Sequence, residues 1–176
     1  GVSCFPMYGV KMISSQEISE IVKSGRIILE RMPPIHGGCL YISALLVAMI
    51  NDNSELNAKL VTGSLVVNET TVFSHANISD VFDSGASTSC SWDGHAWVSI
   101  SGIIFDFSIF QTIYSDQTPK KISDMFLKIF GEISYLVGQP SKLNEMGVFY
   151  DQREVLTDSN VTALIQSADK LGLINS

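Results

Sequence analysis

The sequence predicts an α+β fold, in which helices pack on a mostly antiparallel sheet. Apolar residues recur at helical spacing near both ends of the chain, over residues 14–25, 39–50 and 158–171. Between them, residues 59–108 hold short runs of β-branched and aromatic residues separated by turn signals. Helices before and after a block of strands are typical of α+β folds. We expect one domain over residues 1–176, since domains commonly span ~100–200 residues.

The first two predicted helices differ in how much of their surface is apolar. Ser14 and Glu17 have the spacing of a capping box, which predicts a helix start, and Gly25 is expected to end this helix. Its apolar residues lie on one side only. The helix over residues 39–50 is apolar nearly all round, so we expect it at the centre of the core, and the polar residues 51–54 end it.

The middle of the chain predicts strands. Residues 59–67 are rich in β-branched and apolar side chains, and residues 70–74 could pair back on them. A two-residue turn at Ser101-Gly102 predicts a hairpin over residues 94–108. Between these two pairs lie residues 76–93, rich in Ser, Asp and Gly, which we expect to form a long loop over a cleft beside the hairpin.

The C-terminal part of the chain predicts a short helix over residues 122–130, a further strand over residues 146–150 and a last helix capped by Asp158 or Ser159. Apolar residues recur at helical spacing along this last helix, and Gly172 closes it. We expect its apolar stripe to pack on the core.

Composition and charge exclude several classes of protein. The 11 Lys and Arg residues are scattered and are outnumbered by 18 Asp and Glu, for a formal net charge of −7, so we expect no nucleic-acid partner. The longest apolar run, residues 39–50, is shorter than the ~20 residues of a membrane-spanning helix, so we expect no membrane association. Three cysteines are an odd number for a disulfide scaffold, which favours reduced thiols and a cytoplasmic location.

Cys39 is the candidate nucleophile. It opens the apolar helix over residues 39–50, directly after Gly37 and Gly38. A helix N-terminus favours negative charge, including that of a thiolate, and its free N–H groups could stabilise an oxyanion. The two glycines allow a substrate to approach the backbone closely. The alternative is that Cys39 is a core residue, since free cysteines are among the most buried side chains.

The hairpin over residues 94–108 supplies a candidate base and its partner. With Ser101-Gly102 as the turn, alternation places His95, Trp97 and Asp106 on one face, opposite an apolar face that must meet the core. His95 and Asp106 are then diagonal neighbours with Cα atoms ~7–8 Å apart. An acid beside a histidine fixes its tautomer and supports the imidazolium. The alternative is a His and an Asp that face solvent on a half-exposed sheet.

Three segments together resemble the transglutaminase-like core: Gly37-Gly38-Cys39 before an apolar helix, Gly94-His95-Ala96-Trp97-Val98, and Ile104-Phe105-Asp106. That core belongs with the wider papain-like cysteine-enzyme fold, which also includes the arylamine N-acetyltransferases. In those families a Cys at a helix start, a His on one strand and an Asp on the next form the catalytic triad, in this chain order. The resemblance covers residues 33–111 and implies a papain-like fold.

The resemblance also implies an activity, namely cysteine-dependent acyl transfer or hydrolysis of an amide or peptide through an acyl-enzyme. The partner would be a protein, a peptide or a small amide substrate, and no cofactor is expected. Gly38, His36 and Trp97 are the expected contacts for substrate and oxyanion. The families also use an upstream Gln or Trp as an oxyanion donor, for which Gln16 is a further candidate.

Two alternatives of another class stay open. One is a non-catalytic binding domain of the same fold. The other is a zinc-stabilised interaction domain, because His36, Cys39, Cys90 and His95 form two closely spaced pairs of the ligands that structural zinc prefers. In a zinc site, Asp106 would serve only to orient one of the metal ligands. The triad uses Cys39, His95 and Asp106 together, so we expect no bound metal.

Overall fold

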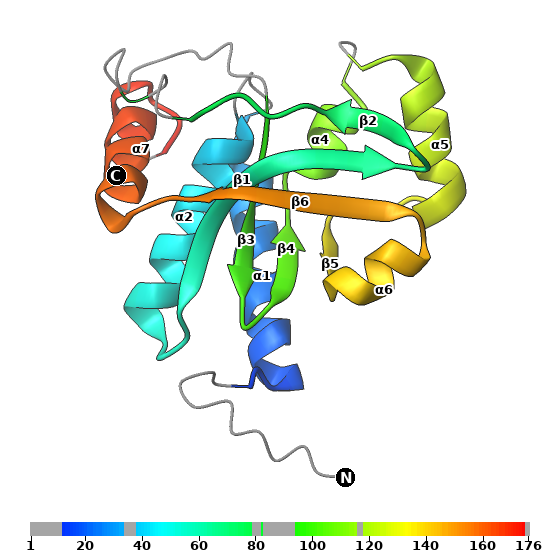
Figure 1. Ribbon diagram of the computed structural model, residues 1–176. Coiled ribbons are helices and arrows are strands. Elements are labelled where there is room, and N and C mark those ends of the chain that lie inside the picture. Colours follow the sequence, from blue (N-terminus) through cyan, green and yellow to red (C-terminus); the bar gives the residue numbers. More distant parts are fainter. Residues whose placement is uncertain (1–11, 34–37, 79–81, 83–93, 116–117, 175–176) are drawn as a thin grey trace, which may run out of the picture.

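The computed structural model describes residues 12–33, 38–78, 82, 94–115 and 118–174 of the chain. Within them the fold is α+β, as predicted, with helices around a curled sheet (Figure 1). All strand pairings found in these residues are antiparallel. None of the helices in the described ranges is both long enough and apolar enough to cross a bilayer.

The sheet is built around one long strand, β1. Six strands occur in the described residues: β1 (Ala58–Val67), β2 (Thr70–Phe73), β3 (His95–Ile100), β4 (Ile103–Asp106), β5 (Leu136–Gly138) and β6 (Val148–Val155). One edge of β1 pairs with β6, and the other edge pairs first with β3 and then with β2. Register shifts interrupt its pairing with β6 at Thr62/Gly63 and with β2 at Leu65/Val66. Such irregularities bend a strand, and β1 is visibly curved in Figure 1.

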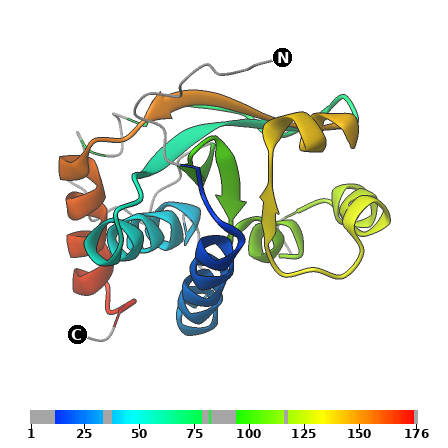
Figure 2. The same cartoon turned by 90° about the horizontal axis from the view of Figure 1, so that it is seen from below.

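Helices cover both faces of the sheet. They are α1 (Ser15–Arg31), α2 (Gly38–Asn53), α4 (Ile109–Ile113), α5 (Lys120–Phe130), α6 (Pro140–Glu145) and α7 (Asp158–Lys170). Figure 2 shows α1, α2 and α7 on one side of the β3–β4 hairpin and α4 and α5 on the other. The two hydrophobic clusters of the core follow the same division, because alternate residues of each strand point to opposite faces.

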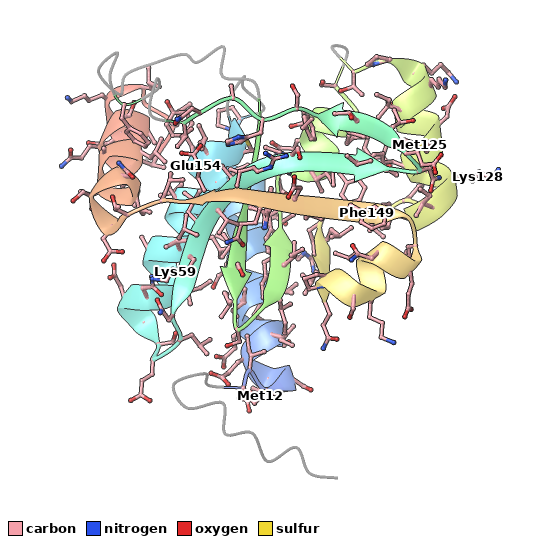
Figure 3. All side chains as sticks on the ribbon, viewed as in Figure 1. Met12, Lys59, Met125, Lys128, Phe149 and Glu154 are labelled. Carbon is pink, nitrogen blue, oxygen red and sulfur yellow. The ribbon has the colours of Figure 1, made fainter. Side chains whose placement is uncertain are left out.

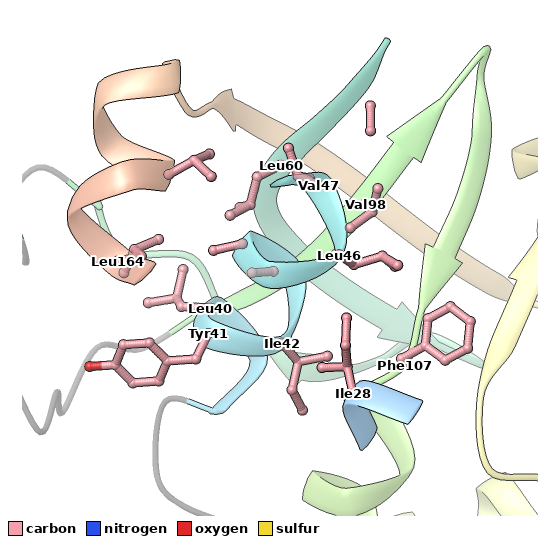
Figure 4. Packing of buried hydrophobic residues seen from close by; sticks show 14 of the residues in the cluster. Ile28, Leu40, Tyr41, Ile42, Leu46, Val47, Leu60, Val98, Phe107 and Leu164 are labelled. Carbon is pink, nitrogen blue, oxygen red and sulfur yellow. The ribbon is translucent and has the colours of Figure 1, made fainter. Parts of the chain in front are cut away.

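The helix α2 is the centre of the first cluster, as its all-round apolar sequence predicts. Leu40, Leu46 and Val47 from α2 meet residues of α7 and of the sheet, including Leu164, Leu60 and Val98 (Figure 4). Every residue from Gly38 to Ala44 is buried. The start of α2 is therefore held firmly against the core, which matters because Cys39 lies there.

Most predicted elements are confirmed with small changes at their ends. The capping box of Ser14 and Glu17 is present, but the expectation that this helix ends at Gly25 is wrong, since α1 continues to Arg31. Gly25 lies where α1 meets the ring of Phe107, and a Cβ at this position would overlap that ring. The glycine therefore permits close packing inside the helix.

Three elements were not predicted, namely α4, β5 and α6. The last strand, β6, runs well beyond the predicted residues 146–150. The prediction that Asp158 or Ser159 caps the last helix is wrong, since Thr157 is the N-cap of α7 and its side chain accepts from the N–H of Asn160. The loop predicted over residues 76–93 lies outside the described residues except for 76–78 and 82.

Candidate active site

The β3–β4 hairpin has the predicted turn and register. Ser101 and Gly102 both have positive φ, 51° and 80°, as a tight two-residue hairpin turn requires. Ile100 pairs with Ile103 and Val98 with Phe105. Because β3 begins at His95 and β4 ends at Asp106, this register brings these two residues to the same end of the hairpin.

The side chains of His95 and Asp106 form a direct, buried pair. Nε2 of His95 lies 2.5 Å from Oδ2 of Asp106, and each residue is 1 % exposed. The alternative that both face solvent is therefore wrong. A carboxylate can only accept a hydrogen bond, so Nε2 must carry a hydrogen. The remaining ring nitrogen, Nδ1, is the one available to another partner.

Cys39 also acts on His95. It lies in the first turn of α2 and is 9 % exposed. Burial alone lowers the pKa of His95, but the charge of Asp106 and the hydrogen bond to it raise this pKa, and a hydrogen bond and charge from Cys39 raise it further. The net pKa of His95 is about 10. His95 is thus an imidazolium at neutral pH, placed between a thiol and a carboxylate.

Asp106 is satisfied on both of its oxygens. Oδ1 accepts from the backbone N–H of Ser108 at 3.2 Å, from the Ser108 hydroxyl at 3.2 Å and from the N–H of Ile109 at 3.1 Å. These contacts stabilise the start of α4, where N–H groups have no partner within the helix. Oδ2 accepts from His95 and also from the hydroxyl of Tyr150 at 2.8 Å. The carboxylate is therefore held in one orientation.

Aromatic rings enclose the imidazole of His95. Phe73, the last residue of β2, stacks on it with ring centroids 4.6 Å apart and an angle of 10° between the planes. Trp97 and Tyr150 lie at centroid distances of 6.1 Å and 6.3 Å. The rings of Trp97 and Tyr150 pack edge to face, with their centroids 4.9 Å apart. Such packing restricts the ring of His95 and keeps water from its bond with Asp106.

A second His–acid pair joins the segment after β2 to β6. Nε2 of His75 is 3.0 Å from Oε1 of Glu154 and 3.4 Å from the hydroxyl of Thr62. Glu154 comes from β6 and is labelled in Figure 3, and it also accepts from the N–H of Ile78. These contacts attach the segment after β2 to β6. They support Phe73, two residues before His75, in its position over His95.

The other residues named from the sequence have different positions. Gly38 is the first residue of α2, beside Cys39, and is buried. Trp97 is 2 % exposed and packs against His95 and Tyr150, so it supports the pair from within the core and has almost no surface for a substrate. Gln16 is exposed in the first turn of α1, near Met12, whereas α2 begins at the other end of α1 (Figures 1 and 3). His36 lies outside the described residues.

Only two of the four candidate zinc ligands, Cys39 and His95, lie in the described part of the chain, since His36 and Cys90 do not. Among the described residues, no group of three or more His, Cys, Asp or Glu side chains is arranged to hold a metal ion. The contacts that the structure gives Asp106 go to His95, Tyr150 and the start of α4.

The sequence did not indicate Tyr150, Phe73 or Ser108 as parts of the site. Tyr150 and Phe73 lie in predicted strands, and the predicted pairing of β2 with β1 is confirmed, but no local pattern shows that β6 also pairs with β1. The chain matches no family model, and comparisons with curated proteins and with solved structures found no match either. The geometry of Cys39, His95 and Asp106 is therefore the basis on which a function can be argued.

Proposed function

We propose that the protein catalyses cysteine-dependent acyl transfer, or hydrolysis of an amide or peptide, through an acyl-enzyme on Cys39. The observation that carries the proposal is the buried His95–Asp106 pair, together with the influence of Cys39 on the pKa of the same imidazole. A buried imidazolium beside a thiol stabilises the thiolate, which is the nucleophilic form. The position of Cys39 at the start of α2 adds the favourable field of the helix N-terminus.

Each residue has a distinct part in the proposed reaction. The Cys39 thiolate attacks the carbonyl carbon of the substrate, and the carbonyl oxygen takes the negative charge. Free N–H groups at the start of α2 can stabilise that oxyanion. The C–N bond then breaks, and the His95 imidazolium gives its proton to the leaving amine.

Neutral His95 next accepts a proton from water or from an acceptor amine, which attacks the thioester and releases Cys39. Asp106 keeps the Nε2 hydrogen of His95 directed at Oδ2. Nδ1 thereby stays free to exchange the reacting proton.

The described architecture supports a papain-like fold with a transglutaminase-like core. The cysteine opens a central helix that packs on an antiparallel sheet, and the histidine and aspartate lie on the two adjacent strands of one hairpin. This arrangement agrees with the chain order of the triad residues in the families that the sequence resembles. The proposed substrates are proteins, peptides or small amides, which react by this chemistry without a cofactor.

An activated ester tests the acyl-enzyme without knowledge of the natural substrate. We expect p-nitrophenyl acetate to give a burst of p-nitrophenolate equal to the amount of protein, and peptide mass spectrometry to locate the acetyl group on Cys39. Cys39→Ala should abolish the burst and keep the fold, because Ala is the best helix former and the side chain is small. Cys90→Ala is the matched control and should keep the burst.

Other results would favour the alternatives. Equal loss of the burst in Cys39→Ala and Cys90→Ala, together with one zinc per chain in the purified protein, would indicate the zinc-stabilised domain. An unreactive Cys39 in a folded, zinc-free protein would indicate a non-catalytic binding domain of the same fold.

A further inference from the structure

Tyr150 contacts the candidate triad but has no role in the reaction proposed above. Its hydroxyl donates to Oδ2 of Asp106 at 2.8 Å, and this is the same oxygen that lies 2.5 Å from Nε2 of His95. The two donors come from β6 and β3, which pair with opposite edges of β1. One carboxylate oxygen is therefore shared between a phenol and the imidazole.

We propose that Tyr150 is a positioning residue whose hydroxyl limits the negative charge that Asp106 presents to His95. This inference rests on the proposed function, because it concerns the strength with which Asp106 holds the proton on His95. An imidazolium that is held too strongly is a poorer acid toward the leaving group. By sharing Oδ2, Tyr150 keeps His95 able to release its proton.

The contacts of Asp106 favour an electrostatic effect of Tyr150 over a purely structural one. The Oδ1 atom already accepts three hydrogen bonds from Ser108 and Ile109, so the carboxylate is oriented without Tyr150. The ring of Tyr150 is held independently by its edge-on contact with Trp97. Removal of the hydroxyl alone should therefore leave Asp106 in place and change only the charge at Oδ2.

Tyr150 acts as a donor throughout the accessible pH range. Burial, then the charge of Asp106 and the hydrogen bond to it, raise the pKa of Tyr150 well above its ordinary value of 10.0. Within the described ranges of the chain, the titratable groups that face His95 are Cys39 from α2, Asp106 from β4 and Tyr150 from β6. The other described aromatic neighbours of His95, Phe73 and Trp97, are uncharged.

The test compares Tyr150→Phe with the unchanged chain by NMR at neutral pH. The hydrogen between His95 Nε2 and Asp106 Oδ2 should give a low-field resonance. Without the competing phenol, this hydrogen bond strengthens, so the resonance should move further to low field in Tyr150→Phe. Tyr135→Phe is the matched control and should leave it unchanged, because Tyr135 stacks on Phe107, outside the site.

Cys39 alkylation by iodoacetamide gives a second readout, since its rate depends on the imidazolium. In a plot of this rate against pH, the inflection on the alkaline side should lie about one pH unit higher in Tyr150→Phe. This is the size expected for a hydrogen bond to a charged group. Incorporation of 3-fluorotyrosine, whose phenol is a stronger donor, should move the NMR resonance in the opposite direction. That measurement needs no substitution and serves if Tyr150→Phe does not fold.

The outcomes separate this inference from the proposed function. An unmoved resonance and an unmoved inflection in Tyr150→Phe, with a reactive Cys39 in the unchanged chain, overturn the role of Tyr150 alone. A downward shift of the inflection also overturns it, since Tyr150 then only maintains geometry. If Cys39 of the unchanged chain reacts as an ordinary thiol, the proposed function fails and the role of Tyr150 fails with it.

Discussion

Asp106 is joined to His95 through Oδ2 and, through Oδ1, to the first turn of the helix that follows it in the chain. The same side chain thus fixes the histidine and ends β4 by starting α4. Because the residue is 1 % exposed, its charge acts on His95 with little screening by water. Asp106 therefore supports the fold and orients His95 at the same time.

Asp106→Asn should keep the fold and remove most of the activity. An amide in place of Oδ2 turns N–H toward Nε2 of His95, which then becomes an acceptor, so the hydrogen moves to Nδ1. Nδ1–H cannot accept the thiol proton, and the comparable change in serine proteases lowers kcat by about 10⁴-fold. The burst rate with p-nitrophenyl acetate measures this, with circular dichroism as the check on folding. Full activity in a folded Asp106→Asn variant would contradict the triad.

The stability of the protein should fall as the pH rises from neutral toward 10. The pKa of His95 is raised from 6.5 to about 10 in the folded chain, so the folded state holds a proton that the unfolded state releases. This contribution to the free energy of unfolding is complete below pH 6.5 and is lost as the pH rises through 10.

Thermal unfolding at several pH values measures this dependence, with His95→Gln as the control because it removes the titrating group. Tm of the unchanged chain should fall more steeply between pH 7 and 10 than Tm of His95→Gln. Parallel curves for the two proteins would contradict the raised pKa of His95.

Gly25→Ala should destabilise the protein, although alanine normally stabilises a helix by ~1 kcal/mol relative to glycine. A Cβ at this position overlaps the ring of Phe107, and overpacking of a core costs about 1–3 kcal/mol. Ser19→Ala, on an exposed part of the same helix, should instead be neutral or slightly stabilising. Urea unfolding gives both free energies, and a stabilised Gly25→Ala variant would exclude the close contact with Phe107.

Gly63→Ala should be more disruptive, with a loss of about 3 kcal/mol or more in the free energy of unfolding. The added Cβ would overlap the backbone carbonyl of Asp151 on β6 and would also meet the ring of Trp97. Backbone atoms cannot turn aside as a side chain can, so β6 must move. Since Tyr150 precedes Asp151, its bond with Asp106 should weaken as well. A Gly63→Ala protein with unchanged stability would show that β6 does not lie this close to β1.

The local patterns predicted the hairpin well because they act over a few residues. The turn at Ser101-Gly102 sets the register, and alternation then assigns His95 and Asp106 to one face. The burial of that face could not be predicted in this way. It depends on Phe73 and Tyr150, which reach His95 only through the pairing of β2 and β6 with β1.

Gly25 shows the same limit, whereas α4 was missed because it is short. A glycine after an amphipathic stretch usually ends a helix, and only its contact with Phe107, far along the chain, gives it another role. The five residues of α4 are too few for a clear helical period. Their start depends on the carboxylate of Asp106, which accepts hydrogen bonds from N–H groups two and three residues further on, a local contact that was not predicted.

The alkylation rate of Cys39 by iodoacetamide at pH 6, followed by mass spectrometry of its peptide, tests the proposed nucleophile directly. An ordinary thiol, with a pKa of ~8.5, is almost entirely protonated there, whereas a thiolate paired with His95 should react roughly 10- to 100-fold faster than Cys39 in the unfolded chain. His95→Gln should abolish this difference. A folded protein whose Cys39 reacts no faster than in the unfolded chain, or equally fast with and without His95, would exclude a thiolate activated by His95.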